Sequence, residues 1–167
     1  KKTLKFLKKN KLAKKSQIYI FSDAAKDNQS KKNVREVRKI LKKIHGFKKI
    51  KIVFRKKNFG LAKNFISGIS QVCNKHRKLI VLEDDNLTSP FFLSYMNDAL
   101  ILYSNNKKVA SISGYSYPIS NKRKGYYFLR LANSWGWATW KRSWDLYEKN
   151  GKKILKKLST KKIRYDF

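Results

Sequence analysis

The sequence predicts an α/β fold, a mostly parallel Rossmann-like sheet flanked by helices, and two observations lead to that prediction. Short apolar runs alternate along the chain with longer segments whose apolar residues recur at helical spacing. This alternation is typical of parallel sheets, because each parallel strand needs a crossover connection, usually a helix. The run 79–82 is apolar throughout, as expected for a strand that is buried on both faces.

Each element follows from its own local pattern. The run 17–23 is rich in aromatic and β-branched residues and predicts a strand, whereas apolar residues at helical spacing predict a helix over 33–44. His45-Gly46 ends that helix, and Ser89-Pro90 begins a later one that continues to Tyr103, with Ser89 as N-cap. The other elements are predicted in the same way: strands 50–54, 109–113 and 126–131, and helices 1–9, 61–72, 137–147 and 153–158.

The chain has the length of one domain. Its 167 residues, 1–167, are enough to bury a sizeable core. The first predicted helix has no strand before it, although a helix in an alternating α/β unit normally follows one. We therefore expect the domain to be incomplete at its start.

The charge of the chain is extreme and dispersed. There are 42 Lys and Arg against 10 Asp and Glu, a net charge of +32, and the lysines extend from Lys1 to Lys162. Proteins that recognise nucleic acid usually concentrate charge on one face and rely on arginine. The pattern argues against a specific nucleic-acid partner, although it attracts anions such as nucleotides and acidic lipid headgroups.

Cysteine content and hydropathy bear on the compartment. Cys73 is the single cysteine, so an internal disulfide is excluded, and no apolar run approaches the roughly 18 residues that span a bilayer. These features predict a cytoplasmic protein whose membrane contact, if any, is peripheral and at the inner face.

Three consecutive acids, Glu83, Asp84 and Asp85, follow the apolar run 79–82 directly. Adjacent carboxylates repel one another unless a cation lies among them, and oxygen ligands suit Mg²⁺ or Mn²⁺. The carboxyl end of a parallel strand is also where α/β sheets bind their ligands. The alternative is an ordinary solvated turn after a strand.

Two further strand ends carry polar residues. Asp23 ends the predicted strand 17–23 and can accept hydrogen bonds from a base or sugar, or form a simple Asx turn. The segment from Asn58 to Asn64 contains Gly60, which allows a tight turn into a helix N-terminus that favours anions. The alternative is that Gly60 merely begins a helix.

All four tryptophans lie within 135–144. Trp135 and Trp137 flank Gly136, and we expect both to face a pocket, where aromatic rings stack on sugars. Trp140 and Trp144 are four residues apart, and we expect them to pack one face of a helix in the core.

Five motifs occur in order: Asn58-x-Gly60-Leu61-Ala62-x-Asn64, Val81-Leu82-Glu83-Asp84-Asp85, Ser89-Pro90-x-Phe92-Leu93, Ser113-Gly114-Tyr115 and Trp135-Gly136-Trp137-Ala138-Thr139-Trp140. Together they resemble nucleotide-sugar glycosyltransferases of family 2, which have the GT-A fold and are related to the N-acetylglucosaminyltransferase I group. The resemblance extends from the first helix to about Tyr147.

The resemblance implies roles for individual residues. Asp85 ligates Mn²⁺ or Mg²⁺ that bridges to the donor diphosphate, Glu83 belongs to the same acidic motif, and Asp84 contacts the ribose or donor sugar. Asp23 reads the nucleobase. The segment with Asn58, Gly60 and Asn64 lies near the nucleotide, and the segment with Trp135, Gly136 and Trp137 lies beside the acceptor.

The implied activity is metal-assisted, inverting sugar transfer from a nucleoside-diphosphate sugar, with UDP favoured, to a glycan or lipid-linked acceptor in surface polysaccharide synthesis. Inversion needs a general base. Asp145 is the candidate on this chain, but relatives often place the base further downstream, so the domain is expected to be incomplete at its end as well. The alternatives are a catalytically inactive transferase-like fragment and a basic nucleic-acid-binding protein.

Overall fold

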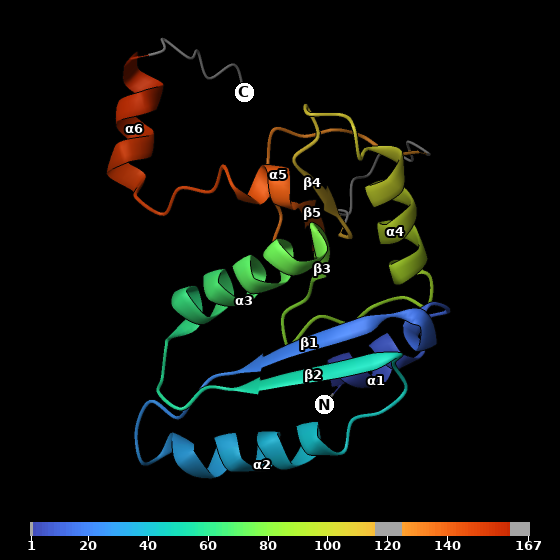
Figure 1. The fold of residues 1–167 in the computed structure, drawn as a ribbon, viewed down its shortest axis with the longest axis vertical. Helices are drawn as coiled ribbons and strands as arrows, with labels where there is room; N and C mark the ends of the chain where they lie inside the picture. Colours follow the sequence, from blue (N-terminus) through green and yellow to red (C-terminus); the bar gives the residue numbers. More distant parts are fainter. Residues whose placement is uncertain (1, 116–124, 161–167) are drawn as a thin grey trace, which may run out of the picture.

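The computed structural model describes residues 2–115 and 125–160 and has a mixed α/β architecture (Figure 1). Its helices are α1 (Lys2–Lys8), the short 3-10 helix η1 (Ala13–Lys15), α2 (Ser30–Lys42), α3 (Leu61–His76), α4 (Phe92–Leu102), α5 (Lys141–Trp144) and α6 (Gly151–Thr160). Its strands are β1 (Gln17–Ser22), β2 (Lys49–Phe54), β3 (Lys78–Val81), β4 (Ser111–Ser113) and β5 (Trp137–Trp140). Every element expected before residue 114 is present, with ends shifted by a few residues.

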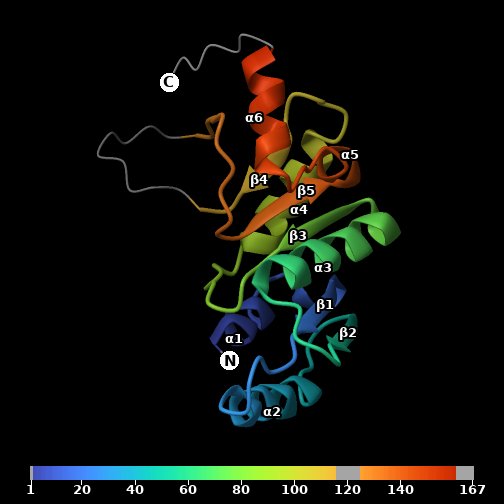
Figure 2. The ribbon, with the colours of Figure 1, turned by 90° about the vertical axis from the view of Figure 1, so that its left-hand side faces the viewer.

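The strands of the described residues form two sheets rather than one. β1 and β2 pair in parallel, with Gln17 opposite Lys49. β5 lies antiparallel between β3 and β4, and Trp137 is opposite both Val81 and Ser113. Figure 2 shows the strands following one another in the order β2, β1, β3, β5, β4. The α/β class is confirmed, whereas a continuous, mostly parallel sheet is not present.

The region after residue 125 differs most from expectation. The helix expected over 137–147 is a strand, β5, followed by the short helix α5. Tertiary pairing explains this, because β5 is hydrogen-bonded on both edges and Ala138, Thr139 and Trp140 are buried. The strand expected over 126–131 is absent, since its residues are exposed and pair with no neighbouring strand in the described parts of the chain.

The start of α4 is a smaller correction. Ser89 and Pro90 precede the helix as a turn, in which the Ser89 carbonyl accepts a hydrogen bond from Phe92 N at 3.2 Å. Phe91 occupies the N-cap position and makes no side-chain capping bond. The motif therefore marks the approach to the helix rather than its first turn.

Two hydrophobic clusters cover opposite faces of the sheet β3-β5-β4. On one face, α4 packs Met96 and Leu100 against Ala138 and Trp140 of β5, and the Trp140 indole donates to the Leu100 carbonyl at 3.1 Å. The other face carries the α3 cluster, formed by Ile69, Cys73 and Val81 with Phe65, Leu79, Trp137 and Trp144 around them. Alternation along β5 sends successive side chains to these two faces.

In residues 2–115 and 125–160, no helix combines the length and the apolar character that crossing a membrane requires.

Candidate functional site

The acidic turn after β3 is held in place from two sides. Asn86 closes it from within, because its side-chain oxygen accepts a bond from Glu83 N at 2.9 Å. Its amide nitrogen also donates to the Asp85 carboxylate at 3.2 Å. From outside, the Thr3 hydroxyl of α1 donates to the Asp84 carbonyl at 2.5 Å. The first helix therefore helps to hold the turn that carries Asp85.

Asn10 fixes the segment that follows the turn. Its side chain is only 4% exposed. It donates to the Thr88 hydroxyl at 3.1 Å and accepts from Leu93 N at 2.9 Å. Sequence analysis did not identify Asn10 or Thr3, because their partners lie far along the chain and neither residue belongs to a recognisable motif.

A pocket of about 550 Å³ opens beside this turn. It is lined by residues from the turn, from the start of α4 and from the segments flanking β4 and β5: Leu82, Asp85, Asn86, Leu87, Thr88, Ser89, Phe92, Gly114, Tyr115, Trp135 and Gly136. The predicted metal ligand Asp85 and the predicted acceptor residues Trp135 and Gly136 thus line the same pocket. Four of the five sequence motifs contribute to its wall.

Two glycines allow the pocket wall to close tightly. Gly114 N donates to the Gly136 carbonyl at 2.7 Å, which joins the two segments directly. A Cβ on Gly114 would lie 2.5 Å from the Phe92 ring and 2.6 Å from the Met96 methyl group. Gly136 has φ of +72°, a conformation that other residues rarely adopt. Both glycines are therefore required by the geometry.

Aromatic rings form the outer rim of the pocket. Tyr115 and Trp135 meet edge to face, with ring centroids 4.8 Å apart. Trp135 is 52% exposed. Exposed aromatic faces bind the C–H surfaces of sugars and other ring-shaped ligands.

The three acids do not converge. Of Glu83, Asp84 and Asp85, only Asp85 lines the pocket. Among the described residues, no three His, Cys, Asp or Glu side chains lie close enough together to hold a metal ion. A single exposed carboxylate beside a pocket still fits Mg²⁺ or Mn²⁺, because Mg²⁺ sites typically use one or two carboxylates, several waters and the phosphates of a substrate.

Asp23 lies in a second polar network, at the ends of β1 and β2. Its carboxylate accepts hydrogen bonds from three backbone N–H groups, those of Ala24, Phe59 and Gly60, each at 2.9 Å. Asn58 adds a bond from its side chain to the Ala24 carbonyl at 2.6 Å. Gly60, with φ of +73°, then begins α3. Much of the acceptor capacity of Asp23 is thus used to join β1 to the entry of α3.

Asn64 and two arginines complete this network. The side-chain oxygen of Asn64 accepts from Arg55 Nε at 3.0 Å, and its amide donates to the Phe21 carbonyl at 3.3 Å. Arg38 donates to the carbonyls of Asp23 at 3.0 Å and Arg55 at 2.8 Å. The predicted residues Asp23, Asn58, Gly60 and Asn64 therefore meet, together with Arg55 from the same strand end. Arg38 was not predicted, since one arginine on a lysine-rich helix gives no signal in the sequence.

Replacing Asp23 with Ala is expected to destabilise the fold by about 2 kcal/mol, because three N–H groups lose a charged acceptor at once. The matched control is Glu36→Ala, which removes an exposed carboxylate that pairs with Lys39. Its effect should stay within about 0.5 kcal/mol. Urea unfolding monitored by tryptophan fluorescence measures both, and equal midpoints for the two variants would contradict the structural role of Asp23.

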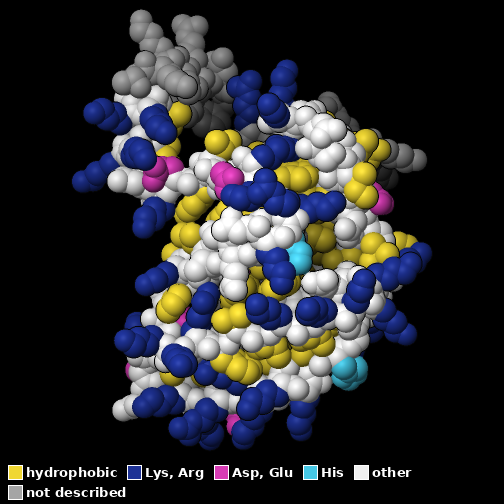
Figure 3. Space-filling model, viewed as in Figure 1, with side chains coloured by type: hydrophobic (Ala, Val, Ile, Leu, Met, Phe, Trp, Pro, Cys, Tyr) yellow, Lys and Arg dark blue, Asp and Glu magenta, His cyan; other side chains and the backbone are white. Residues whose placement is uncertain are grey.

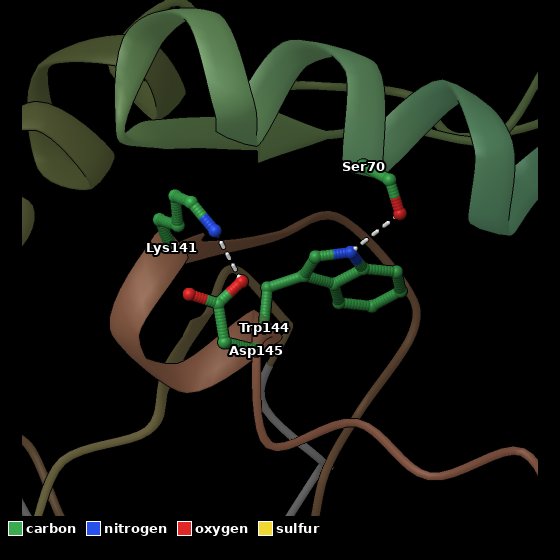
Figure 4. A network of polar contacts seen from close by, with 4 residues as sticks. All are labelled: Ser70, Lys141, Trp144 and Asp145. Carbon is green, nitrogen blue, oxygen red and sulfur yellow. Dashed lines mark hydrogen bonds and ion pairs between the residues drawn. The ribbon is translucent and has the colours of Figure 1, made fainter.

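Asp145, the candidate general base, lies at the other end of the sheet. β5 ends with Trp140 opposite Lys78, at the start of β3, whereas Asp85 follows the end of β3. Figure 4 shows Asp145 turned toward Lys141, with 2.5 Å between Oδ1 and Nζ, and Trp144 bonded to Ser70 of α3. The structure therefore does not bring Asp145 to the pocket.

The tryptophans divide between three environments. Trp135 faces the pocket, as expected. Trp137 does not, because strand alternation directs it into the α3 cluster. The ring centroids of Trp137 and Trp144 are 6.4 Å apart there. The Trp137 indole N–H is buried and has no acceptor in the described residues. Trp140 is in the core as expected, but it lies on the opposite face of the sheet from Trp144 rather than on a shared helix face.

Comparison with known proteins assigns no family or function to the chain. A scan against protein-family models, a search of curated proteins and a search of solved structures each find no match for the chain. A functional assignment therefore depends on the motifs and on the pocket that they form.

Proposed function

We propose that the chain forms the donor-binding part of a metal-assisted glycosyltransferase, which moves a sugar from a nucleoside-diphosphate sugar, with UDP favoured, to a glycan or lipid-linked hydroxyl. The observation that carries the proposal is the shared pocket. Asp85, the end of the acidic motif, lines it together with Trp135 and Gly136 of the tryptophan motif. These motifs are far apart in the sequence and carry the resemblance to family 2 transferases.

The pocket supplies groups that this chemistry needs. Departure of a nucleoside diphosphate develops negative charge, which a divalent cation at Asp85 would neutralise when bound. Asp85 would hold that cation together with the donor phosphates. Trp135 and Tyr115 offer ring surface for a sugar, and the chain's net charge of +32 attracts the anionic donor.

We also propose that the two sheets are halves of one Rossmann-like sheet of GT-A type. The bond from Arg55 N to Ser22 O directs the main chain of Tyr19 away from β2, and the bond from Lys141 N to Arg77 O directs that of Ile80 away from β5. In the described residues, each sheet therefore has an edge without a partner strand, on β1 and on β3. Ile18 and Ile80 pack against the same core cluster, so these two edges are close in the fold.

The composition of the edges supports this arrangement. β1 carries no charged residue or proline, and β3 has one lysine at its first position. By contrast β2, at the outer edge, carries Lys49 and Lys51, and β4 is only three residues long. Lysines and short strands protect true edges, whereas long apolar edges invite pairing. A strand between β1 and β3 would join the halves and bring Asp23 and Asp85 to one edge.

Calorimetric titration with UDP and GDP, each with and without Mn²⁺, tests the donor site. We expect UDP to bind at least about tenfold more tightly with Mn²⁺ present, because the cation bridges its phosphates to Asp85. Inorganic pyrophosphate is the control for simple anion attraction. Equal affinity for pyrophosphate and UDP, or affinity that Mn²⁺ leaves unchanged, would contradict the proposal.

The two alternative functions make different experimental predictions from the glycosyltransferase proposal. An inactive transferase-like fragment would bind the donor without transferring or hydrolysing the sugar. A nucleic-acid-binding protein would need a concentrated basic face. Figure 3 instead shows Lys and Arg side chains spread over the whole visible face, with hydrophobic side chains between them, and thus gives no support to the nucleic-acid alternative.

A further inference from the structure

Large apolar side chains are exposed in the segment that leads to Trp135 at the pocket. Tyr126 is 82% exposed, Phe128 67%, Leu129 59% and Leu131 63%. Single exposed apolar residues are ordinary, whereas several of them in one short segment are typical of an interaction surface. Neither the predicted strand nor the proposed donor site accounts for it.

The run lies against the end of α4. The Phe128 ring meets Tyr103, which caps α4, edge to face at 5.6 Å. Ile101 and Leu102, in the last turn of α4, are exposed as well. We call the set the aromatic surface: Ile101, Leu102, Tyr126, Phe128, Leu129 and Leu131. It leads directly into the pocket, since the same segment continues to Trp135.

The chain on both sides of the aromatic surface is basic in sequence. No acidic residue occurs in the sequence between Asp98, on α4, and Asp145. Of the described residues, the same stretch contains five basic ones: Lys107, Lys108, Arg130, Lys141, which pairs with Asp145, and Arg142, which donates to the Tyr103 and Val109 carbonyls. A second copy of a chain with a net charge of +32 would be repelled, so the charge points to an anionic partner.

We infer that the aromatic surface docks on an anionic phospholipid bilayer. Tyrosine, phenylalanine and leucine side chains insert at the boundary between headgroups and acyl chains, while lysine and arginine pair with lipid phosphates. Docking there brings the segment that continues to Trp135 beside the bilayer. The further step, that the pocket then receives a lipid-linked acceptor, rests on the proposed function.

Site-specific labelling tests the docking surface directly. Cys73 is fully buried, and burial raises the pKa of its thiol to about 11, so it stays protonated and protected at neutral pH. A cysteine introduced by Phe128→Cys is therefore labelled selectively with an environment-sensitive dye such as NBD. The matched control is Leu146→Cys, at a residue that is 82% exposed and lies after α5.

On vesicles of phosphatidylglycerol we expect the label at 128 to shift to the blue and to brighten several-fold, while the label at 146 stays unchanged. Cosedimentation adds a second measurement. The triple variant Tyr126→Ser, Phe128→Ser, Leu129→Ser should bind these vesicles at least about tenfold more weakly, and Leu146→Ser should bind like the wild type. Neutral phosphatidylcholine vesicles should retain little protein.

Three results would overturn the inference. They are vesicle binding without a spectral shift at 128, equal shifts at 128 and 146, and a dimer in sedimentation velocity that Phe128→Ser dissociates. The first would mean adhesion through lysines anywhere on the surface. No nucleotide is present in these experiments, so their failure leaves the donor-site proposal intact, and failure of the nucleotide titration leaves the docking surface intact.

Discussion

Asp85→Ala is expected to abolish the Mn²⁺-dependent part of UDP binding, a loss of more than about 100-fold. Asp85 is the only acid of the acidic motif that lines the pocket, so no neighbouring carboxylate can replace it there. Removal of groups that merely orient a metal ligand typically costs 10- to 100-fold, which makes about 100-fold a lower bound for the ligand itself. Calorimetric titration of UDP into both proteins, at fixed Mn²⁺, measures the ratio.

The control for this prediction is Asp98→Ala. Asp98 is an exposed acid on α4 and does not line the pocket. Its removal changes the net charge by the same amount as removal of Asp85. We expect UDP affinity within about twofold of the wild type, because exposed charges at a distance are screened by salt. Similar losses for the two variants would mean that Asp85 acts through net charge rather than as a ligand.

Local sequence patterns were sufficient for the first part of the fold. The helices α2 and α3 and the strands β1 to β3 have periodicities that their own segments determine, and they lie within a few residues of the prediction. β5 was missed for a physical reason. Trp140 and Trp144 match the four-residue step of a helix, and only the pairing of residues 137–140 with β3 and β4 makes this segment a strand.

The sequence predicted those residues of the candidate site that belong to a motif, and it did not predict the others. Asp85, Trp135 and Gly136 were chosen from their motifs, and they line one pocket. Asn10 and Thr3, which position that pocket, are polar residues on or after a lysine-rich helix and gain meaning only from partners about eighty residues away. Spacing within a segment cannot reveal such contacts. The same limit explains Asp145, whose position depends on the direction of β5.

Gly114→Ala is expected to destabilise the fold by about 1–3 kcal/mol, the usual cost of overpacking a core. The added methyl group would lie 2.5 Å from the Phe92 ring, 2.6 Å from the Met96 methyl group and 2.9 Å from the Gly136 carbonyl oxygen. Met96 is fully buried, and the backbone of Gly136 is held by its bond to Gly114 N. None of these groups can move aside without disturbing the core. Urea unfolding monitored by circular dichroism gives the free energy of unfolding.

Substitutions at two other glycines distinguish the effect of crowding from the effects of helix propensity and backbone strain. Gly151, at the start of α6, has nothing within 4 Å of an added Cβ, so Gly151→Ala should leave stability unchanged or raise it by at most about 1 kcal/mol. Gly60 is equally uncrowded but has φ of +73°, so Gly60→Ala should cost about 1–2 kcal/mol through backbone strain alone. If Gly114→Ala proved as harmless as Gly151→Ala, the close contact of residues 114 and 136 that forms the pocket wall would be wrong, and with it the geometry that brings Trp135 to Asp85.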